Sequence, residues 1–414
     1  MPRVGRRWLT LFTLAWLAIW MVQLTPLQLL LPLQLDDQLS DGGDHWVRGV
    51  VISGLILGIG GLVAVIAGPV AGAASDRTGH LPAWLGGRRR VWALGGIWLT
   101  AICLILTGLA HQPALVALAW IGVSAGIAVA SAAFTAMIAD QLPADQRGAA
   151  SASVGSSQAA GIVFGVGVVV TLGLSVLGGY LFLAVVVALV GTIAALGLPD
   201  PPATRDVRAA TVERDRFRSL RDRDFSWMLT GRLVTNIGNA LGTSLLLFFL
   251  LYGLDQDDTA AENNLLLLVV VYTVFVVGSS IVSGLASDRT GRRRMPTVIA
   301  ACIQALSGVL ILAVPTFSMT LVAAALMGVG YGAFSTVGLA FATDLLPHEE
   351  DHGRDLGVVN VAAALGQLLG PMLGAGLVAA VGGFWLLFLM ASLLSVAGGL
   401  LTLLAREKSA VDVT

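Results

Sequence analysis

Residues 72–79 read GAASDRTG, and residues 284–291 read GLASDRTG. A second pair of matching segments follows in the same order, DQLP at 140–143 and DLLP at 344–347. The distance between the two motifs is eight residues longer in the first copy, and an insert at 80–87 accounts for it. The chain therefore consists of two related halves, and each motif marks equivalent positions in them.

Twelve long apolar runs surround these motifs, and each is near the ~20 residues that a helix needs to cross a bilayer. Hydrophobic residues make up 56% of the 414 residues and charged residues only 12%, which excludes a soluble enzyme because a water-soluble surface carries more charge. Only helices satisfy their own backbone in lipid as an open chain. The predicted spans are 9–35, 47–74, 91–110, 114–139, 149–172, 174–198, 227–253, 264–286, 297–314, 318–343, 356–381 and 383–405.

The positive charges alternate between the loops and so predict the orientation. All but two of the 24 Lys and Arg residues lie at the N-terminus, in even-numbered loops or in the C-terminal tail. Arg48 and Arg232 are the two exceptions, and they fall inside predicted helices. Because positively charged loops stay in the cytoplasm, we expect both termini on that side of the plasma membrane. The first run is too long for a signal peptide and lacks a small-residue cleavage site, so we expect a retained helix.

The halves form the predicted domains. Residues 1–199 and 225–414 are each expected to fold as a six-helix bundle, and 200–224 join them as a cytoplasmic linker. The linker opens with prolines and then alternates in charge, which suits either a short interfacial helix or a solvated tether. Both halves start on the same side, so they are parallel repeats about an axis along the membrane normal. The predicted fold class is an all-α integral membrane protein with twelve transmembrane helices in two pseudo-symmetric six-helix bundles.

Several classes of function are disfavoured. A net charge of −1 gives no basic field for nucleic acid. Cys103 and Cys302 form no CxxC or Cys/His cluster, so no metal site or disulfide framework is expected. No GxxxxGK[ST] motif is present for an ATP-driven pump. We expect no enzyme activity, no cofactor and a monomer in the lipid bilayer, and a scaffold or receptor is disfavoured because no soluble domain is present.

Twelve helices, two parallel halves and GxxSDRxG after the second and eighth helices together resemble the major facilitator superfamily. SDRT at 75–78 with GRRR at 87–90, GRDLGVVNVAAALGQ at 353–367 and DFSWMLTGR at 224–232 are similar to its glycoside and sucrose symporter-like branch. The resemblance implies secondary transport by alternating access, with a small polar solute such as a sugar or glycoside as substrate. The competing interpretation is efflux of drugs or other amphiphiles by the same fold.

The repeated motif predicts a cytoplasmic gate. Asp76 and Asp288 end helices where a carboxylate can face a neighbouring helix N-terminus or pair with arginine. The resemblance implies that Asp76 meets the start of the eleventh helix and Asp288 the start of the fifth, contacts that must break for inward opening. The alternative is that the arginines only satisfy the positive-inside rule. The predicted gating residues are Asp76, Arg77, Arg147, Arg232, Asp288, Arg289 and Arg354.

Polar residues recur on single faces of several predicted helices, at the spacing of a helical turn. The resemblance implies that helices one, four, seven and ten line a solute site near the midplane. Polar side chains in lipid are costly, so these faces should turn inward. Aromatic rings beside amides suit a sugar, whose C–H faces stack and whose hydroxyls need hydrogen-bond partners. The predicted substrate-binding residues are Trp20, Gln23, Ser131, Thr135, Asn236, Asn239, Tyr331, Asn360 and Gln367.

Each of these residue types also has a structural interpretation. Serine and threonine often bond back to their own helix, and amides can join neighbouring helices. Tryptophan can face lipid near the interface. Arg232 could extend to the cytoplasm along the helix surface instead of acting as a gate or substrate contact.

The driving force stays open at this stage. All 25 Asp and Glu residues fall in loops or at predicted helix ends, whereas proton symporters commonly use a buried carboxylate. The Asp residues that bind sodium in melibiose-type symporters have no match here. Proton coupling and facilitated diffusion are therefore alternatives. Efflux is disfavoured because the fifth helix reads GSSQAAGIVFGVG at 155–167, without the proline of the antiporter motif GxxxGPxxGG.

Overall fold

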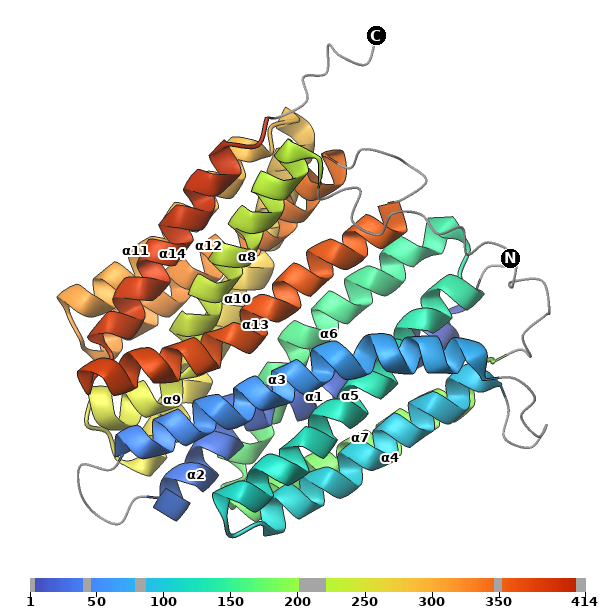
Figure 1. Ribbon diagram of the computed structural model, residues 1–414, viewed down its shortest axis with the longest axis horizontal. Helices are drawn as coiled ribbons and strands as arrows, with labels where there is room; N and C mark the ends of the chain where they lie inside the picture. Colours follow the sequence, from blue (N-terminus) through green and yellow to red (C-terminus); the bar gives the residue numbers. More distant parts are fainter. Residues whose placement is uncertain (1–3, 40–45, 79–86, 201–220, 346–351, 407–414) are drawn as a thin grey trace. The chain divides into compact units, whose positions relative to one another are not determined.

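The computed structural model describes residues 4–39, 46–78, 87–200, 221–345 and 352–406. Only the backbone is described for residues 139, 144–145, 352–364 and 367. Every regular element within these ranges is a helix (Figure 1). The chain forms two compact units, residues 1–210 and 211–414. The boundary falls within a segment that the structure does not describe, so the linker helix and the predicted domain limits stay predictions.

The first unit contains an interrupted first span and five further long helices. Its elements are α1 (Arg6–Thr25), η1 (Pro26–Leu30), α2 (Leu31–Leu39), α3 (Trp46–Arg77), α4 (Arg88–Leu109), α5 (Pro113–Gln141), α6 (Ala144–Thr171) and α7 (Val176–Gly197). The short π-helical turn η1 begins at a proline, which has no N–H to continue the regular α-helical ladder. Despite this turn, α1, η1 and α2 together form one continuous span of 34 residues.

The second unit repeats this order of long helices. Its elements are α8 (Arg223–Ser244), α9 (Leu246–Phe248), η5 (Phe249–Gly253), α10 (Asp258–Thr290), α11 (Arg294–Ala313), α12 (Phe317–Asp344), α13 (His352–Val381) and α14 (Trp385–Leu403). Its first span is also irregular, because α8 and the segment after it are bent by 44° at a break around Leu245.

The twelve predicted runs all coincide with helical segments. Among the described residues, ten helices are long and apolar enough to cross a membrane, and the bent pair that starts with α8 makes an eleventh. The remaining predicted run coincides with α13, whose part from Leu368 to Val381 is a shorter apolar helix. The helices exceed the predicted runs by a few residues at several ends, because helices continue past the apolar stretch into their polar last turns. In this way α10 includes Asp258 and Glu262, which we expected to precede it.

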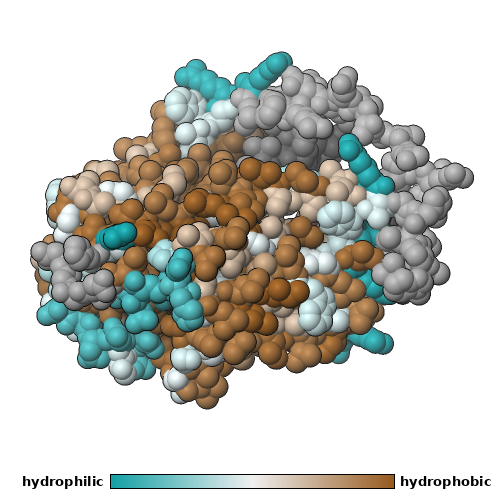
Figure 2. All heavy atoms as spheres, turned by 60° about the horizontal axis from the view of Figure 1, so that its bottom comes forward, coloured by the Kyte–Doolittle hydropathy of each residue, from teal (hydrophilic) through white to brown (hydrophobic). Residues whose placement is uncertain are grey.

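Large apolar side chains remain exposed along the helices, as lipid contact requires. Leu62 and Val70 of α3 are 52% and 62% exposed, and Val274 and Val282 at the equivalent positions of α10 are 62% and 68% exposed. Figure 2 shows that hydrophobic residues cover most of one face, with hydrophilic residues towards its margins. A surface of this kind would not be stable in water, so the exposed residues face the bilayer.

The two units share one packing scheme. In the first unit α5 packs against α3 and α4, α1 packs against α6 and α7, and α4 packs against α7. In the second unit α12 packs against α10 and α11, α8 packs against α13 and α14, and α11 packs against α14. Replacing each helix by its counterpart converts one set into the other. The sequence repeat is therefore also a repeat of structure.

Glycines set the closest of these contacts. A Cβ on Gly126 of α5 would lie 2.8 Å from the Gly96 carbonyl oxygen of α4, and a Cβ on Gly330 of α12 would lie 2.8 Å from the Ala300 carbonyl oxygen of α11. Gly126 and Gly330 are equivalent residues, as the alignment of DQLP with DLLP shows. Small residues allow membrane helices to approach closely, which explains why this position is glycine in both copies.

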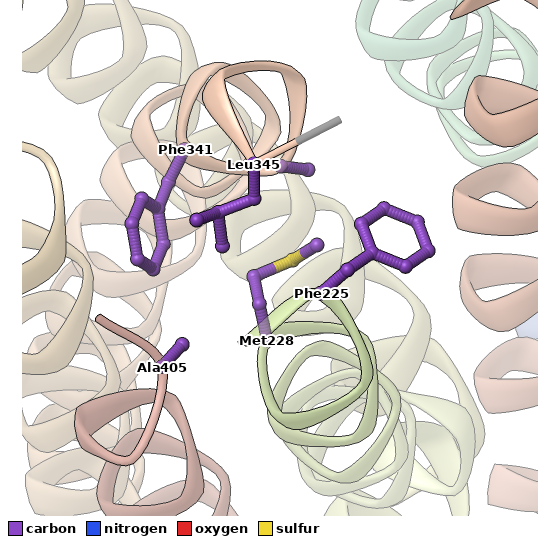
Figure 3. Packing of buried hydrophobic residues seen from close by; sticks show 6 residues of the cluster. Phe225, Met228, Phe341, Leu345 and Ala405 are labelled. Atoms are coloured by element: carbon purple, nitrogen blue, oxygen red, sulfur yellow. The ribbon is translucent and has the colours of Figure 1, made fainter. Parts of the chain in front are cut away.

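A buried apolar cluster joins three helix ends in the second unit (Figure 3). Phe225 and Met228 from the first turns of α8 pack against Phe341 of α12, Leu345 just after α12 and Ala405 just after α14. The start of α8 and the end of α12 therefore lie at the same level of the unit, and the two helices run in opposite directions.

Candidate functional site

The polar residues of α8 are of two kinds. Some form hydrogen bonds only within their own helix, and others contact side chains or backbone groups of other helices. Asn236 is 3% exposed, and its amide nitrogen donates to the Arg232 carbonyl oxygen of its own helix at 2.9 Å. Its Cβ also lies 2.7 Å from the position that a Cβ on Gly366 of α13 would take. This environment suits helix packing, and the solute-contact role of Asn236 stays a prediction.

Asn239, one turn further along α8, reaches α10 and α12. Its amide nitrogen and oxygen lie 3.5 Å and 3.4 Å from the Tyr272 hydroxyl. Tyr272 in turn stacks on Tyr331 of α12, with ring centroids 6.4 Å apart. Both rings are partly exposed, whereas Asn239 is buried behind them. The predicted residues Asn239 and Tyr331 are thus brought together by a tyrosine that sequence reasoning did not select.

Arg232 lies deep in the second unit. It follows the first residue of α8 by nine positions, about 13 Å along the helix axis. Its Nη1 donates to the Ser335 carbonyl oxygen at 3.5 Å, and Ser335 precedes the end of α12 by the same nine positions. Because these two helix ends lie at one level, the guanidinium sits as deep as its own Cα. It does not reach back to the helix ends.

The surroundings of Arg232 are aromatic and backbone groups. Its Cζ lies 5.9 Å from the centroid of the Phe334 ring, and its buried Nε has no hydrogen-bond partner. Gly338 leaves room for the guanidinium, since a Cβ there would lie 3.2 Å from Nη1. Within the part of the chain that the structure describes, no carboxylate forms an ion pair with Arg232. Arg232, Asn239, Tyr272, Tyr331 and Ser335 are called the polar strip below.

In the first unit, the predicted residue Trp20 belongs to a ladder of aromatic residues along α1. Trp16 and Trp20 have ring centroids 6.1 Å apart, and Phe12 and Trp8 continue the series towards the N-terminus. The indole nitrogens of Trp16 and Trp20 are buried without a hydrogen-bond partner. Gln23 follows on the same helix and is partly exposed.

For the other predicted substrate-binding residues, the structure gives only their exposure or their helix. Ser131 of α5 is partly exposed, and Thr135, one turn later, is exposed. Asn360 and Gln367 belong to α13, but their side chains lie outside the described residues. The structure therefore joins Asn239 and Tyr331 through Tyr272. Among the predicted residues whose side chains are described, no other pair shares a contact of this kind.

The repeated loop motif forms a charge cluster within the first unit. Arg89, 5% exposed, lies 2.6 Å from Asp76 and 2.8 Å from Asp140, and it also donates to the Ser75 hydroxyl. Arg88 contacts Asp140 at 3.7 Å. Arg77, the predicted anchor of this loop, is exposed. The residue that binds Asp76 in its own unit is therefore an arginine of the GRRR segment, which we did not predict.

The second unit repeats part of this cluster. Nε of Arg293 lies 2.9 Å from Asp344, and these two residues are the counterparts of Arg89 and Asp140. Asp288 and Arg289 are exposed at the end of α10. Arg147 donates to the Leu142 carbonyl oxygen at 3.2 Å, and the Arg354 side chain lies outside the described residues. The expected contacts of Asp76 with the eleventh helix and of Asp288 with the fifth stay predictions.

Two functional candidates were missed, and both left a signal in the sequence. Tyr272 is one of only four tyrosines and interrupts the apolar run at 265–278. Arg89 is the middle arginine of a GRRR segment that occurs in both halves. Among the described residues, no group of three or more His, Cys, Asp or Glu side chains could hold a metal ion.

The comparisons with known proteins agree with this architecture. The sequence profile of the Major Facilitator Superfamily matches residues 84–278 and 233–413, so the chain belongs to this superfamily. A crystal structure of the nucleoside transporter NupG (D323A mutant) has a TM-score of 0.75 at 13% identity, covering 97% of this chain and 99% of that one.

A bacterial homolog of the human lysosomal transporter Spinster, inward-facing and unoccupied, has a TM-score of 0.70 at 16% identity, covering 97% and 98% of the two chains. A POT family transporter in complex with 5-aminolevulinic acid has a TM-score of 0.70 at 14% identity, covering 95% of each chain. None of the curated proteins matches the sequence. The chain is thus a multi-pass membrane transporter of the secondary type and not an enzyme.

Proposed function

We propose that this transporter moves a small polar solute, a sugar or glycoside, by alternating access. The observation that carries the proposal is the contact of Asn239 with Tyr272 and the stacking of Tyr272 on Tyr331. The amide and phenol groups are 3.4–3.5 Å apart, at the long end of hydrogen bonding, so a solute hydroxyl can replace either partner at little cost. The partly exposed rings offer the stacking surface that sugar C–H faces need.

The experiment is uptake of labelled sugars and glycosides into proteoliposomes. Asn239→Ala should raise KM about fivefold or more, the loss expected for one hydrogen bond in a buried site. Asn263→Ala is the matched control, because Asn263 is exposed and bonds only the Thr259 carbonyl oxygen of its own helix. Equal uptake of every sugar by the wild type and Asn239→Ala would contradict the assignment.

The same proteoliposomes test the driving force. We propose proton coupling, with uncoupled facilitated diffusion as the alternative. An inward proton gradient should then accelerate uptake and permit accumulation above the external concentration. Uptake that stops at equal concentrations, with or without the gradient, would establish facilitated diffusion.

Efflux of amphiphiles is the second candidate function, and the aromatic ladder of α1 favours it. Trp16 and Trp20 offer flat aromatic faces, which suit aromatic or cationic drugs. Their two indole N–H groups without a partner suit hydrogen-bond acceptors of the same compounds. Cells that express the protein should then retain less ethidium than cells expressing Trp20→Ala. Equal retention would leave sugar transport as the better proposal.

The gate belongs to the same proposal. We infer that Asp76, Asp288 and Arg232 and the motif arginines Arg77, Arg147, Arg289 and Arg354 control inward opening. The pair of Asp76 with buried Arg89 supports a role for this end of the first unit. Asp76→Asn should shift the inward and outward populations in spin-label distance measurements between the two units. An unchanged distance distribution would exclude Asp76 from the gate.

A further inference from the structure

Arg232 is a cation deep in a membrane-spanning helix, and its side chain is only partly satisfied. Its nearest acceptor is a backbone carbonyl at 3.5 Å, and its buried Nε has no partner. A guanidinium away from water is normally paired with a carboxylate or fully hydrogen-bonded. No carboxylate among the described side chains supplies this partner, so the guanidinium keeps N–H donors that a bound group could accept from.

The depth of the guanidinium excludes a simple anchor. An interfacial arginine extends along its helix to place its charge in the headgroup region. Here the guanidinium is level with Phe334 and Ser335, about 13 Å from the ends of both α8 and α12. The absence of a side chain at Gly338 keeps that space open. A bound group could therefore approach the guanidinium at the depth where a transported solute passes.

The internal repeat shows that the fold does not require these residues. By the motif alignment, Tyr272, Tyr331 and Phe334 correspond to Gly60, Ile127 and Ala130 of the first unit. The first unit nevertheless packs α3, α5 and α4 in the same scheme as α10, α12 and α11. The polar and aromatic groups around Arg232 are thus specific to the second unit.

We propose that Arg232 binds an oxyanion of the transported solute, so that the substrate is an acidic sugar, either a sugar carboxylate or a sugar phosphate. A guanidinium offers parallel N–H donors that match both groups. The hydroxyls of the same solute would meet Tyr331, Tyr272 and Asn239 further along the polar strip. The inference rests on the proposed function, because it names the class of sugar that this site takes.

The experiment compares labelled glucuronate, glucose 6-phosphate and methyl glucoside in proteoliposomes containing the wild type, Arg232→Gln, Arg232→Lys or Arg48→Gln. Arg48 is the matched control, since it is the other arginine inside a predicted span but is exposed near the start of α3. We expect wild-type uptake of one or both acidic sugars and at least a tenfold loss, roughly, in Arg232→Gln. Arg232→Lys should retain part of it, and Arg48→Gln should behave as wild type.

Uptake of glucuronate alone would indicate a carboxylate site, and uptake of glucose 6-phosphate alone would indicate a phosphate site. Uptake of both would indicate a site that accepts either oxyanion. Uptake of methyl glucoside alone, or equal uptake of acidic sugars by wild type and Arg232→Gln, would overturn the inference and leave the proposed function standing. Should Arg232→Gln fail to fold, Gly338→Val provides the second variant. It fills the space beside the guanidinium and keeps the charge, and it should cause the same selective loss.

A binding measurement separates this inference from sugar transport as such. Sodium phosphate and sodium acetate, compared with sodium chloride at equal ionic strength, should raise Tm of the wild type and not of Arg232→Gln. If no sugar is transported but this anion-specific shift occurs, the proposed function fails and the anion site stands. If neither anion raises Tm above chloride, the anion site fails.

Discussion

Two arginines show how the surroundings decide what a guanidinium does. Arg89 has two carboxylates within 2.8 Å and lies at a helix end, so its charge is neutralised within its own unit. Arg232 lies deep between α8 and α12 with one long contact to a carbonyl oxygen. The ion pairs of Arg89 stabilise a local structure. Arg232, in contrast, keeps N–H donors that can still bind another group.

Replacing Arg89 should therefore destabilise the first unit. Arg89→Gln removes the cation between two carboxylates and leaves Asp140 only its 3.7 Å contact with Arg88. We expect a loss of ~1–2 kcal/mol, less than for a fully buried pair because Asp76 and Asp140 are 59% and 36% exposed. Thermal unfolding in detergent would show this as a lower Tm. The exposed neighbour Arg77→Gln is the control, and an equal Tm for both variants would contradict the cluster's role.

Individual residues were the least predictable part from sequence. Helical phase placed Asn239 and Tyr331 on faces that turn inward, and these two share a contact. The same phase also selected Asn236, whose amide bonds its own helix and whose Cβ packs at Gly366. Helical periodicity predicts which residues share a face of a helix. Whether a residue on that face can contact a solute depends on how closely the neighbouring helix packs against it. Tyr272 was missed for this reason, since its partners lie on two other helices.

At the scale of helices, glycines allow α4 and α5, and likewise α11 and α12, to pack closely against each other. Gly126→Ala and Gly330→Ala each force a Cβ within 2.8 Å of backbone atoms of the facing helix. We expect each to lower stability by about 1–3 kcal/mol, the usual cost of overpacking. Gly278→Ala, in α10 with open space at its Cβ, should be neutral or slightly stabilising. The three variants can be ranked by Tm, and no difference among them would refute the packing argument.

The end of α7 and the start of α4 are joined by hydrogen bonds of Asp200 and Arg90. The Asp200 carboxylate accepts the Arg90 backbone N–H at 2.7 Å, and the Arg90 side chain donates to the Ala195 and Leu198 carbonyl oxygens. Both contacts satisfy helix-terminal groups that have no partner inside the helix. Burial raises the pKa of Asp200 above its ordinary value, although the Arg90 N–H opposes the shift.

This shift predicts the pH dependence of stability. A carboxyl whose pKa is raised by folding binds its proton more tightly in the folded state, so its contribution to stability falls as pH rises from the ordinary pKa to the raised one. Above that window the contribution is constant. Tm of the wild type should therefore fall relative to Asp200→Asn as pH rises above the ordinary carboxyl pKa of 3.8. A constant difference in Tm over this range would contradict the assignment.

Most helices could be predicted from sequence, because apolar length alone defines a span in lipid. The irregular first span of each unit could not. A break around Leu245 and a π-helical turn at Pro26–Leu30 leave the run apolar throughout, so hydropathy is insensitive to them. Such irregular turns are tolerated in membranes only where other groups satisfy the backbone.

For the whole molecule, the twelve predicted spans are an even number, so we expect both termini on one side of the membrane. The positive-inside rule predicts that this side is the cytoplasm. A fluorescent protein fused to the C-terminus should fluoresce, and alkaline phosphatase at the same site should be inactive. Both reporters fused after Asp257, which precedes α10, should behave in the opposite way. The same result at both sites would require a different number of spans.

The unequal lining of the two units has a consequence for stoichiometry. The two units share one packing scheme, but only the second carries Arg232 together with Tyr272 and Tyr331. No arginine other than Arg48, near the start of α3, lies within the predicted spans of the first half. A titration should therefore saturate at one equivalent of anion per polypeptide, however symmetric its backbone.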